Sequence, residues 1–356
     1  MERQEKKKVV MTFTDTITRK ISFAIFALLL FAPFSFSTAQ TAEVEPKVVV
    51  APVKQKFKRK YRKATSGSET SDEKSIAVDA KVNITLCVAE GNLKITGWER
   101  SEIRAFISNG NEIGFNVREK NKQNKAAWLT VTGLDAARNN QATSRECLSG
   151  EEIELDVPRG ATVNIESRTS ETTIETVRKV FVKNVGGDIS LNNIEQGITA
   201  STYQGDITVE KSGGAITLVS GNGNIVAFDA APTEIGDIFK AKTSSGAITL
   251  QGIEHRQTEI NSNSGSIKFI GAFQSGGQYT FGTTNGSVSL AIPEKSSCKI
   301  NASYGFGAFN SELPLQNLKK NPNPTSKAQS LSASIGSGDA NVNLTTYSGA
   351  IRIRKQ

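Results

Sequence analysis

The chain has 356 residues, of which 37% are hydrophobic and 30 are glycine, a composition that supports a folded core and excludes a disordered or collagen-like chain. One histidine, two methionines and three cysteines exclude a zinc-ribbon array, a haem protein and a disulfide-packed mini-domain, because each needs more of those ligands. Six Lys or Arg against three Asp or Glu in residues 1–39, and nine against five in residues 40–74, account for most of the net charge of +8 and leave +1 for residues 75–356. The basic character therefore belongs to the N-terminal segments, and we do not expect nucleic-acid binding by the body of the chain.

Residues 1–39 have the order of a secretory signal peptide. Arg19 and Lys20 precede an apolar run from Ile21 to Phe31, and small residues follow up to Ala39. The run is shorter than the roughly 20 residues of a membrane-spanning helix, so we expect cleavage after Ala39 and export to the periplasm or surface of a bacterium. If the run is counted on to Phe36, an uncleaved leader that anchors the chain in the inner membrane remains the alternative.

Residues 40–74 are predicted to be a basic, disordered linker. Seven cations lie within ten positions: Lys54, Lys56, Lys58, Arg59, Lys60, Arg62 and Lys63. Such charge density repels itself and stays extended. The simplest interpretation is a solvated linker, and the functional one is electrostatic contact with an anionic membrane or polysaccharide, worth about 1 kcal/mol per charge near the surface.

From residue 75 onward the apolar residues alternate with polar ones, which is the period of a β-strand. The first clear example runs from Ile76 to Val88, with Asp79, Lys81 and Asn83 on the opposite phase. No comparable segment has the period of a helix. The sequence therefore predicts an all-β domain over residues 75–356.

A stricter regularity follows, in which apolar residues recur every nine positions. The first series is Val180, Ile189, Ile198, Ile207, Ile216 and Ile225, and a second series two positions later is Val182, Leu191, Ala200, Val209, Leu218 and Ala227. Since nine is odd, an unbroken strand would place successive members on opposite faces. The chain must therefore turn once per nine residues, and glycines such as Gly187, Gly205 and Gly223 can adopt the positive φ of tight corners.

Looser copies of this unit extend the pattern along the chain. Glycine followed by a small or acidic residue and then Ile or Val recurs at Gly187, Gly205, Gly214, Gly246, Gly265, Gly286 and Gly349. Paired strands give coils of 17 to 23 residues, which predicts a single-stranded β-solenoid (β-helix) in which each coil buries its apolar stripe against its neighbours. We expect it to be right-handed because parallel crossovers are right-handed in about 98% of sheets; an antiparallel meander is the competing architecture.

Polar residues precede the repeat glycines and predict a stacked ladder at the corners. They include Tyr203 with Gln204, Ser244 with Ser245, Asn263 with Ser264, Thr284 with Asn285, and Tyr347 with Ser348. Corner stabilisation is the favoured interpretation, and a repetitive surface for glycan binding is the functional one. Although Asp188, Asp206 and Asp237 follow glycines, the double-glycine calcium repeat does not recur along the chain, and we expect no metal and no cofactor.

Two further expectations concern the irregular end of the chain. Residues 313–327, with three prolines and a Lys pair, are expected to form a loop between coils. The strand from Ile351 to Lys355 alternates apolar and charged residues, which is typical of a terminal strand that resists edge-to-edge association.

Several of these motifs resemble one bacterial family. Residues 91–98 (GNLKITGW), residues 157–163 (VPRGATV), the repeated glycine units and residues 347–353 (YSGAIRI) are similar to the adhesin-like proteins built on β-strand repeats, a domain of unknown function. The resemblance spans residues 75–356. It implies an envelope-exposed β-helical protein and offers no catalytic residues; Ser170 replaces a repeat glycine.

The cysteines and the histidine have separate expected roles. Cys87 is on the polar phase of its strand and Cys147 is in a loop, so the two could pair in an oxidising compartment or remain reduced. Cys298 shares the inward phase of Ile300 and is expected to be a buried free thiol. His255 is expected at the surface of a loop, and no catalytic residue is predicted.

Three functional classes are compatible with these features. The favoured one is an exported, non-catalytic adhesive or scaffolding module that binds an envelope component, either glycan or protein. The alternatives are a membrane-anchored envelope stress or signalling module, which needs an uncleaved leader, and, less favoured, a β-helix enzyme acting on polysaccharide, which needs clustered carboxylates.

Overall fold

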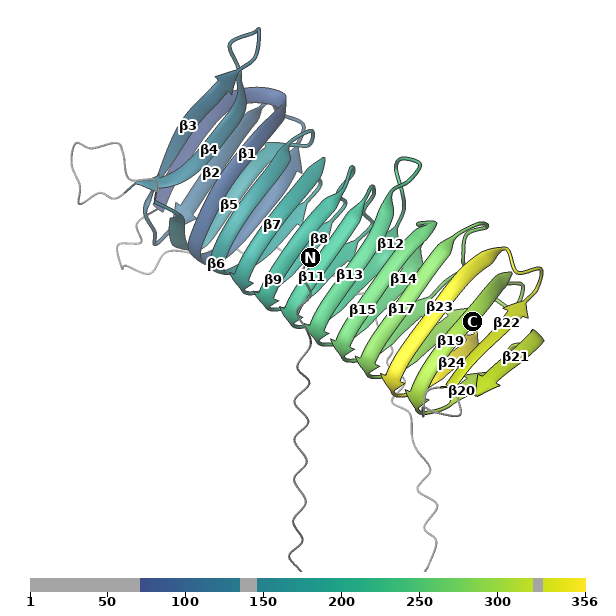
Figure 1. The fold of residues 1–356 in the computed structure, drawn as a ribbon. Helices are drawn as coiled ribbons and strands as arrows, with labels where there is room; N and C mark the ends of the chain where they lie inside the picture. The colour runs from purple at the N-terminus through teal and green to yellow at the C-terminus, as the bar shows by residue number, and fades with distance from the viewer. Residues whose placement is uncertain (1–70, 135–145, 323–328) are drawn as a thin grey trace, which may run out of the picture. The chain divides into compact units, whose positions relative to one another are not determined.

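The computed structural model describes residues 71–134, 146–322 and 329–356, so the predictions for the leader and for the basic cluster of the linker lie outside the described residues. Contacts divide the chain into a unit of residues 1–63 and a unit of residues 64–356, and all the described residues belong to the second unit (Figure 1). Every described element is a β-strand. In the described part of the chain no helix is long and apolar enough to cross a membrane.

The described part of the chain contains 24 strands. They are β1 (Ser71–Trp98), β2 (Glu102–Ser108), β3 (Glu112–Lys120), β4 (Ala126–Leu134), β5 (Leu148–Pro158), β6 (Thr162–Glu175), β7 (Lys179–Gly186), β8 (Ile189–Asn192), β9 (Ile198–Gln204), β10 (Ile207–Glu210), β11 (Ile216–Asn222), β12 (Ile225–Ala230), β13 (Ile238–Ser245), β14 (Ile248–Ile253), β15 (Gln257–Ser264), β16 (Ile267–Ile270), β17 (Gln278–Asn285), β18 (Val288–Ile292), β19 (Cys298–Phe306), β20 (Phe309–Ser311), β21 (Gln316–Pro322), β22 (Gln329–Ile335), β23 (Ala340–Ser348) and β24 (Ile351–Lys355).

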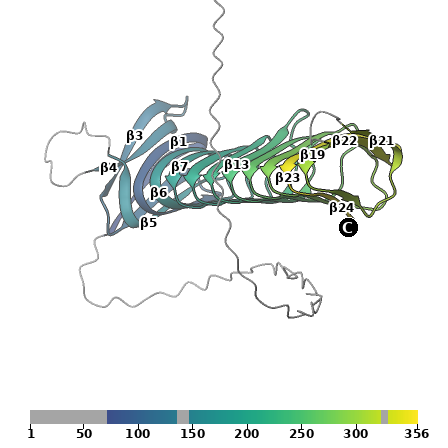
Figure 2. The same cartoon turned by 60° about the horizontal axis from the view of Figure 1, so that its bottom comes forward.

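The strands stack into two facing walls (Figure 2), and the buried side chains form one hydrophobic core. Wall A has the order β3, β4, the first part of β1, the first part of β6, β7, β9, β11, β13, β15, β17, β23, β19, β22, β21. Wall B has the order β2, β5, the last part of β1, the last part of β6, β8, β10, β12, β14, β16, β18, β24, β20. Each coil contributes one strand or strand segment to each wall.

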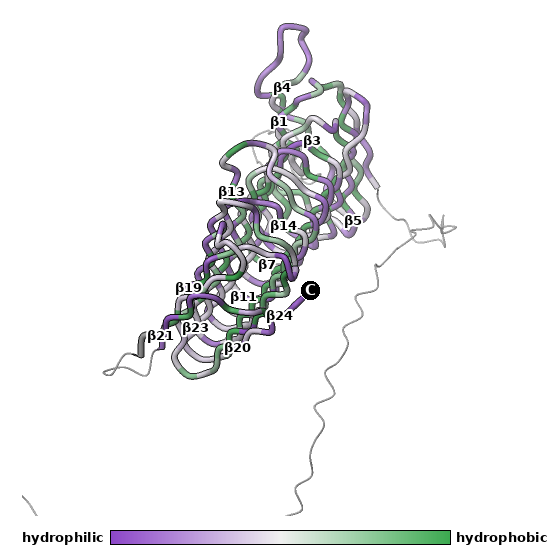
Figure 3. The backbone as a smooth tube through the Cα atoms, turned by 90° about the vertical axis from the view of Figure 1, so that its right-hand side faces the viewer, coloured by the Kyte–Doolittle hydropathy of each residue, from purple (hydrophilic) through white to green (hydrophobic). Residues whose placement is uncertain are grey.

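The register confirms the interpretation of the nine-residue interval. Ile189, Ile207 and Ile225 are aligned in parallel in wall B, while Val180, Ile198 and Ile216 are aligned in wall A, and all six side chains are buried. The alternation of hydrophobic and hydrophilic residues along the tube is visible in Figure 3. The parallel columns confirm the β-solenoid and exclude the antiparallel meander, while the right-handed sense stays a prediction.

A column of residues without large side chains forms the tight corner between the walls. It consists of Ser170, Gly187, Gly205, Gly223, Gly246, Gly265, Gly286, Gly349 and Gly307. A Cβ atom added to Gly205 would lie 2.2 Å from the carbonyl oxygen of Gly187, and one added to Gly246 would lie 2.1 Å from that of Gly223. Gly214, another glycine of the sequence repeat, has the positive φ of a turn, at +84°, but lies at the opposite edge, near Gly197, where a second series of turns joins wall B to the next strand of wall A.

A buried hydroxyl three positions before six of the corner glycines ties neighbouring coils together. Thr243 donates to the carbonyl oxygen of Gly223 at 2.9 Å, Ser262 donates to that of Gly246 at 3.0 Å, and the pattern repeats at Thr202, Ser220, Thr283 and Thr346. These bonds satisfy carbonyl groups that a core of pure hydrocarbon would leave unpaired. The repeat is therefore better written as Ser/Thr-x-x-Gly than as the glycine unit alone.

The first and last coils of the chain lie inside the stack. The coil of β1 is inserted between that of β4 and β5 and that of β6, and the coil of β23 and β24 is inserted between β17 with β18 and β19 with β20. The expectation that the last strand is a terminal edge is therefore wrong. The antiparallel pairs β3–β4 and β21–β22 lie at the two ends instead (Figure 1).

The expected loop over residues 313–327 is also wrong in part. Residues 316–322 form β21, which pairs with β22, because a hairpin at the open end of wall A covers backbone groups that a loop would leave unpaired. Lys319 and Lys320 are exposed on this outermost strand, and such charges discourage the addition of another chain.

The close approach at the corner predicts the effect of a single methyl group. Gly246→Ala should lower the free energy of unfolding by about 3 kcal/mol, because its φ of +147° and the Gly223 carbonyl both oppose a Cβ. Gly236→Ala is the control: its φ is also positive, at +98°, but no atom lies within 4 Å, so we expect a loss of about 1 kcal/mol. Equal losses in urea unfolding of the two variants would contradict the close stacking of the corners.

Candidate functional site

The structure brings two of the sequence-predicted site residues together. Cys87 on β1 and Cys147, which directly precedes β5, form a disulfide with a Cα–Cα distance of 4.7 Å and a sequence separation of 60. The bond ties two neighbouring coils near one end of the stack. Closing a loop of this length contributes on the order of 4 kcal/mol in the chain-entropy model.

Cys298 is a buried free cysteine on β19, as expected. Burial raises its pKa to about 11, so the thiol stays protonated at neutral pH. A neutral, inaccessible thiol is a poor nucleophile, and Cys298 is a packing residue of the hydrophobic core.

The expected surface position of His255 is wrong. Only residues 254–256 connect β14 to β15, and in so short a turn the middle side chain points inward, so His255 is buried while Glu254 and Arg256 are exposed. Its Nε2 lies 2.8 Å from the carbonyl oxygen of Gly214, and its ring meets that of Phe239 edge-on at 5.6 Å. Burial lowers the pKa of His255, although the Gly214 carbonyl and the Asp237 carboxylate oppose that shift.

These contacts define the state of the imidazole. A carbonyl only accepts, so Nε2 carries the proton, and Nδ1 has no hydrogen-bond partner within the described chain. The neutral ring therefore fits the core, because burial, which lowers the pKa of His255, outweighs the carbonyl groups of Gly214 and Ala230, which raise it. His255 is a structural residue of the core.

The corner aspartates are used by the backbone. Asp188 Oδ1 accepts from the backbone N–H of Asp206 at 2.8 Å, Asp206 Oδ1 accepts from that of Asn224 at 2.7 Å, and Asn224 Oδ1 accepts from that of Ala247 at 2.9 Å. This ladder runs beside the corner glycines and accounts for their acidic neighbours. In the residues that the structure covers, no three His, Cys, Asp or Glu side chains gather at one point.

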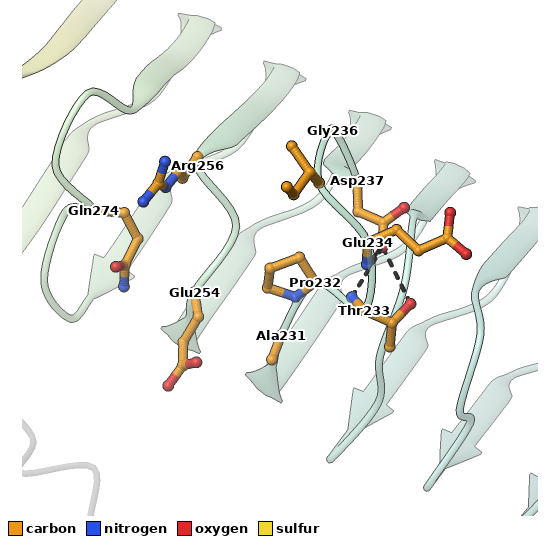
Figure 4. Close-up of a pocket in the computed structure, with 10 residues that line it drawn as sticks. Ala231, Pro232, Thr233, Glu234, Gly236, Asp237, Glu254, Arg256 and Gln274 are labelled. Carbon is orange, nitrogen blue, oxygen red and sulfur yellow. Dashed lines mark hydrogen bonds between the residues drawn. The ribbon is translucent and has the colours of Figure 1, made fainter.

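Two of the hollows on the outer surface concern the candidate site, and the first is at the edge opposite the glycine corners. This loop-edge pocket, of about 520 Å³, is lined by Ala231, Pro232, Thr233, Glu234, Ile235, Gly236, Asp237, Glu254, Arg256 and Gln274. Asp237 closes the loop by accepting from the backbone N–H groups of Thr233 and Glu234 at 2.9 and 2.8 Å. In Figure 4 the carboxylates of Glu234 and Glu254 point away from each other, so the pocket does not present a paired acid and base.

The second hollow, which we call the outer groove, crosses wall A on its solvent side. It has a volume of about 560 Å³ over β13, β15, β17 and β23, and its lining includes Lys242, Ser244, Glu259, Asn261, Asn263, Thr280, Gly282, Thr284 and Thr345. Three of the sequence-predicted corner residues, Ser244, Asn263 and Thr284, belong to it. Asn261, Thr280 and Gly282 were not predicted from the sequence; what they share is the outward phase of strands that are aligned in register.

The chemistry of the outer groove is that of hydroxyl and amide groups. Its charged residues are one lysine and one glutamate, and Glu259 is already paired with Lys240 at 3.5 Å. Such a surface can donate and accept hydrogen bonds but has no ionisable pair placed for proton transfer. It is suited to binding.

The chain matches the model of a known protein family. Residues 74–354 match the model of the family described as Toastrack DUF4097, which confirms the resemblance inferred from the repeat motifs. A candidate cell adhesion protein from Clostridium sporogenes is 13% identical, with 81% of this chain and 100% of that chain covered and a TM-score of 0.26. A candidate lipid binding protein from Parabacteroides distasonis is 11% identical, with 81% and 98% covered and a TM-score of 0.41. Both TM-scores are too low to support an argument about a ligand, and no curated protein matches the chain.

The buried neutral histidine predicts a loss of stability in acid. Its pKa in the folded state is below the unfolded value of 6.5, so as the pH falls through 6.5 the unfolded chain takes up the proton first and the free energy of unfolding decreases, by at most about 1.4 kcal/mol per pH unit. His255→Gln keeps an amide donor for Gly214 and removes the titration. Urea unfolding at about pH 7.5 and 5.5 should show a loss that is larger by about 1 kcal/mol in the parent chain than in the variant, and identical losses would contradict the assignment.

Proposed function

The chain belongs to the Toastrack DUF4097 family, a domain of unknown function with a β-solenoid-like fold, and we propose that it is an exported, non-catalytic adhesive or scaffolding module of the bacterial envelope. Its partner is an envelope component, either a glycan or a protein. The outer groove of wall A is the binding surface, and the stacked coils hold it rigid.

One observation carries the proposal: the outer surface of wall A presents an ordered set of hydroxyl and amide groups in the outer groove. In the described residues the groups with displaced pKa values serve the fold. His255 and Cys298 are buried in the core. Asp237 closes its own loop. Burial raises the pKa of Asp237, but the N–H groups of Glu234 and Thr233 lower it by more, so that its pKa is below the ordinary value. A catalytic group would instead combine a displaced pKa with a free position in an open cleft, whereas the Asp237 carboxylate in the loop-edge pocket is occupied by these hydrogen bonds.

Export is supported by two independent features. Residues 1–39 have the signal-peptide order, and the Cys87–Cys147 bond is of a kind that persists in oxidising compartments such as the periplasm or the cell surface. The basic cluster from Lys54 to Lys63 then adds electrostatic attraction to an anionic membrane or polysaccharide. An inner-membrane anchored module is the second candidate, favoured by the apolar run that continues to Phe36.

Binding by the folded unit can be separated from binding by the basic cluster. A glycan array and immobilised envelope polysaccharide are probed with the chain and with a variant in which the seven cations of Lys54–Lys63 are replaced by Gln. We expect the variant to keep its selectivity and lose only a salt-dependent component, because uncharged hydroxyl and amide contacts are not screened. Complete loss in the variant, or no binding by either protein, would contradict an adhesive groove, and a cleaved product would contradict the non-catalytic role.

Sequencing of the mature N-terminus tests the location. We expect the exported protein to begin at or near Gln40, since cleavage after Ala39 follows the signal-peptide pattern. Recovery of an intact leader in the inner-membrane fraction would reject the exported form and support the anchored one.

A further inference from the structure

Two exposed tyrosines lie on the same side of wall A as the outer groove, one on β9, two strands before the first strand of the groove, and one on β23, its last strand. Tyr203 on β9 is 63% exposed and Tyr347 on β23 is 59% exposed. Each stands two positions before a corner glycine, Gly205 or Gly349, and so each projects outward from the equivalent point of its coil. Large exposed aromatic side chains at repeated positions are not needed by the core that lies behind them.

Each tyrosine ring lies against a glycine of the neighbouring coil. A Cβ atom added to Gly221 would be 3.1 Å from Cδ2 of Tyr203, and one added to Gly305 would be 3.4 Å from Cδ2 of Tyr347. Tyr347 is also held edge-on by Phe306, with ring centroids 5.6 Å apart. The missing side chains let the rings lie close to the backbone, and more than half of each side chain remains open to solvent.

The two rings are separated by a straight polar track. Along wall A, β9 is followed by β11, β13, β15, β17 and β23, which at roughly 4.8 Å per strand places the tyrosines about 24 Å apart. The positions between them in the same row are Gly221, Ser244, Asn263 and Thr284, all small or polar. The outer groove runs beside this row. Gly282, which has no side chain, is part of its lining.

The combination points to one class of ligand. Flat aromatic faces pack against the C–H faces of sugar rings, and hydroxyl and amide groups pair with sugar hydroxyls, whereas an anionic polymer would need a cluster of cations. Only Lys242 and Glu259 are charged in the groove lining, and Glu259 is paired with Lys240, so the lining holds no cluster of cations. Building on the proposed adhesive function, we infer that the outer groove binds a neutral linear polysaccharide that lies across the strands, with Tyr203 and Tyr347 stacking on sugar rings at its two ends.

The inference is tested with defined oligosaccharides and the full chain. Calorimetric titrations use neutral hexasaccharides (β-1,4-linked glucose, β-1,4-linked mannose and α-1,4-linked glucose), the matching disaccharides, and a galacturonate hexamer as the anionic counterpart. We expect one neutral hexasaccharide to bind more tightly than its disaccharide, because only the longer chain reaches both rings, and to bind more tightly than the anionic hexamer.

Three variants test the residues. Tyr203→Ala and Tyr347→Ala should each weaken hexasaccharide binding about threefold to tenfold. Gly282→Arg should abolish it by filling the groove; Gly282 does not have a positive φ, and its added Cβ would meet only the flexible end of Asn261, at 2.8 Å from Oδ1. Ile235→Ala is the matched control, since Ile235 is fully exposed on the loop edge, away from wall A, and it should bind like the parent. Unfolding midpoints of all variants show whether the fold is retained.

The outcomes separate this inference from the proposed function. If a glycan binds and folded Tyr203→Ala, Tyr347→Ala and Gly282→Arg bind it unchanged, the groove assignment is overturned while the adhesive role stands. Preference for the galacturonate hexamer, or no binding of any neutral hexasaccharide by a chain that still retains an envelope partner, also overturns the neutral-glycan assignment alone. If the chain retains no envelope component and no glycan, the proposed function falls as well.

Discussion

The contact between each corner residue and the backbone of the corner before it is the constraint on which the fold depends. At every corner of this column except Ser170 the chain turns from one wall to the other without a side chain, because the carbonyl oxygen of the preceding corner occupies the space of a Cβ atom. Where that space is left empty, both walls keep their parallel register. The buried hydroxyls that donate to the same carbonyls then remove the electrostatic cost of enclosing them.

Insertion of the terminal coils has a consequence for cooperativity. In an array built strictly in chain order, an end coil contacts a single neighbour and can fray. In this solenoid β1 lies between β4 with β5 and β6, and β23 with β24 lies between earlier strands, so contacts distant in sequence hold both described ends of the chain. The outermost positions pass to antiparallel hairpins, whose charged strands limit further growth, and the Cys87–Cys147 bond fastens the coils nearest to one of them.

The two edges of the solenoid differ in regularity. The glycine corners are nearly invariant in length and conformation, so they align rows of outward side chains on wall A at a constant spacing. The opposite edge carries turns of different length, including the loop closed by Asp237 and the short turn that forces His255 into the core. Regular corners produce an extended surface suited to a repetitive polymer, and the outer groove and the two tyrosines lie on that surface.

The period of the apolar residues and the chemistry of single residues were enough to predict the β-solenoid and much of its core from the sequence. The odd interval between isoleucines required a turn in every nine residues, and the alternation identified which side chains are buried, Cys298 among them. The pairing of β17 with β23 across the five strands between them in the chain, the inward turn of His255, and the assembly of Asn261, Thr280 and Gly282 into one groove depended on the tertiary structure. These features arise from contacts between segments far apart in the chain, whose free energies depend on which strands become neighbours. The nine-residue period does not specify those neighbours, because the same period is compatible with different orders of stacking.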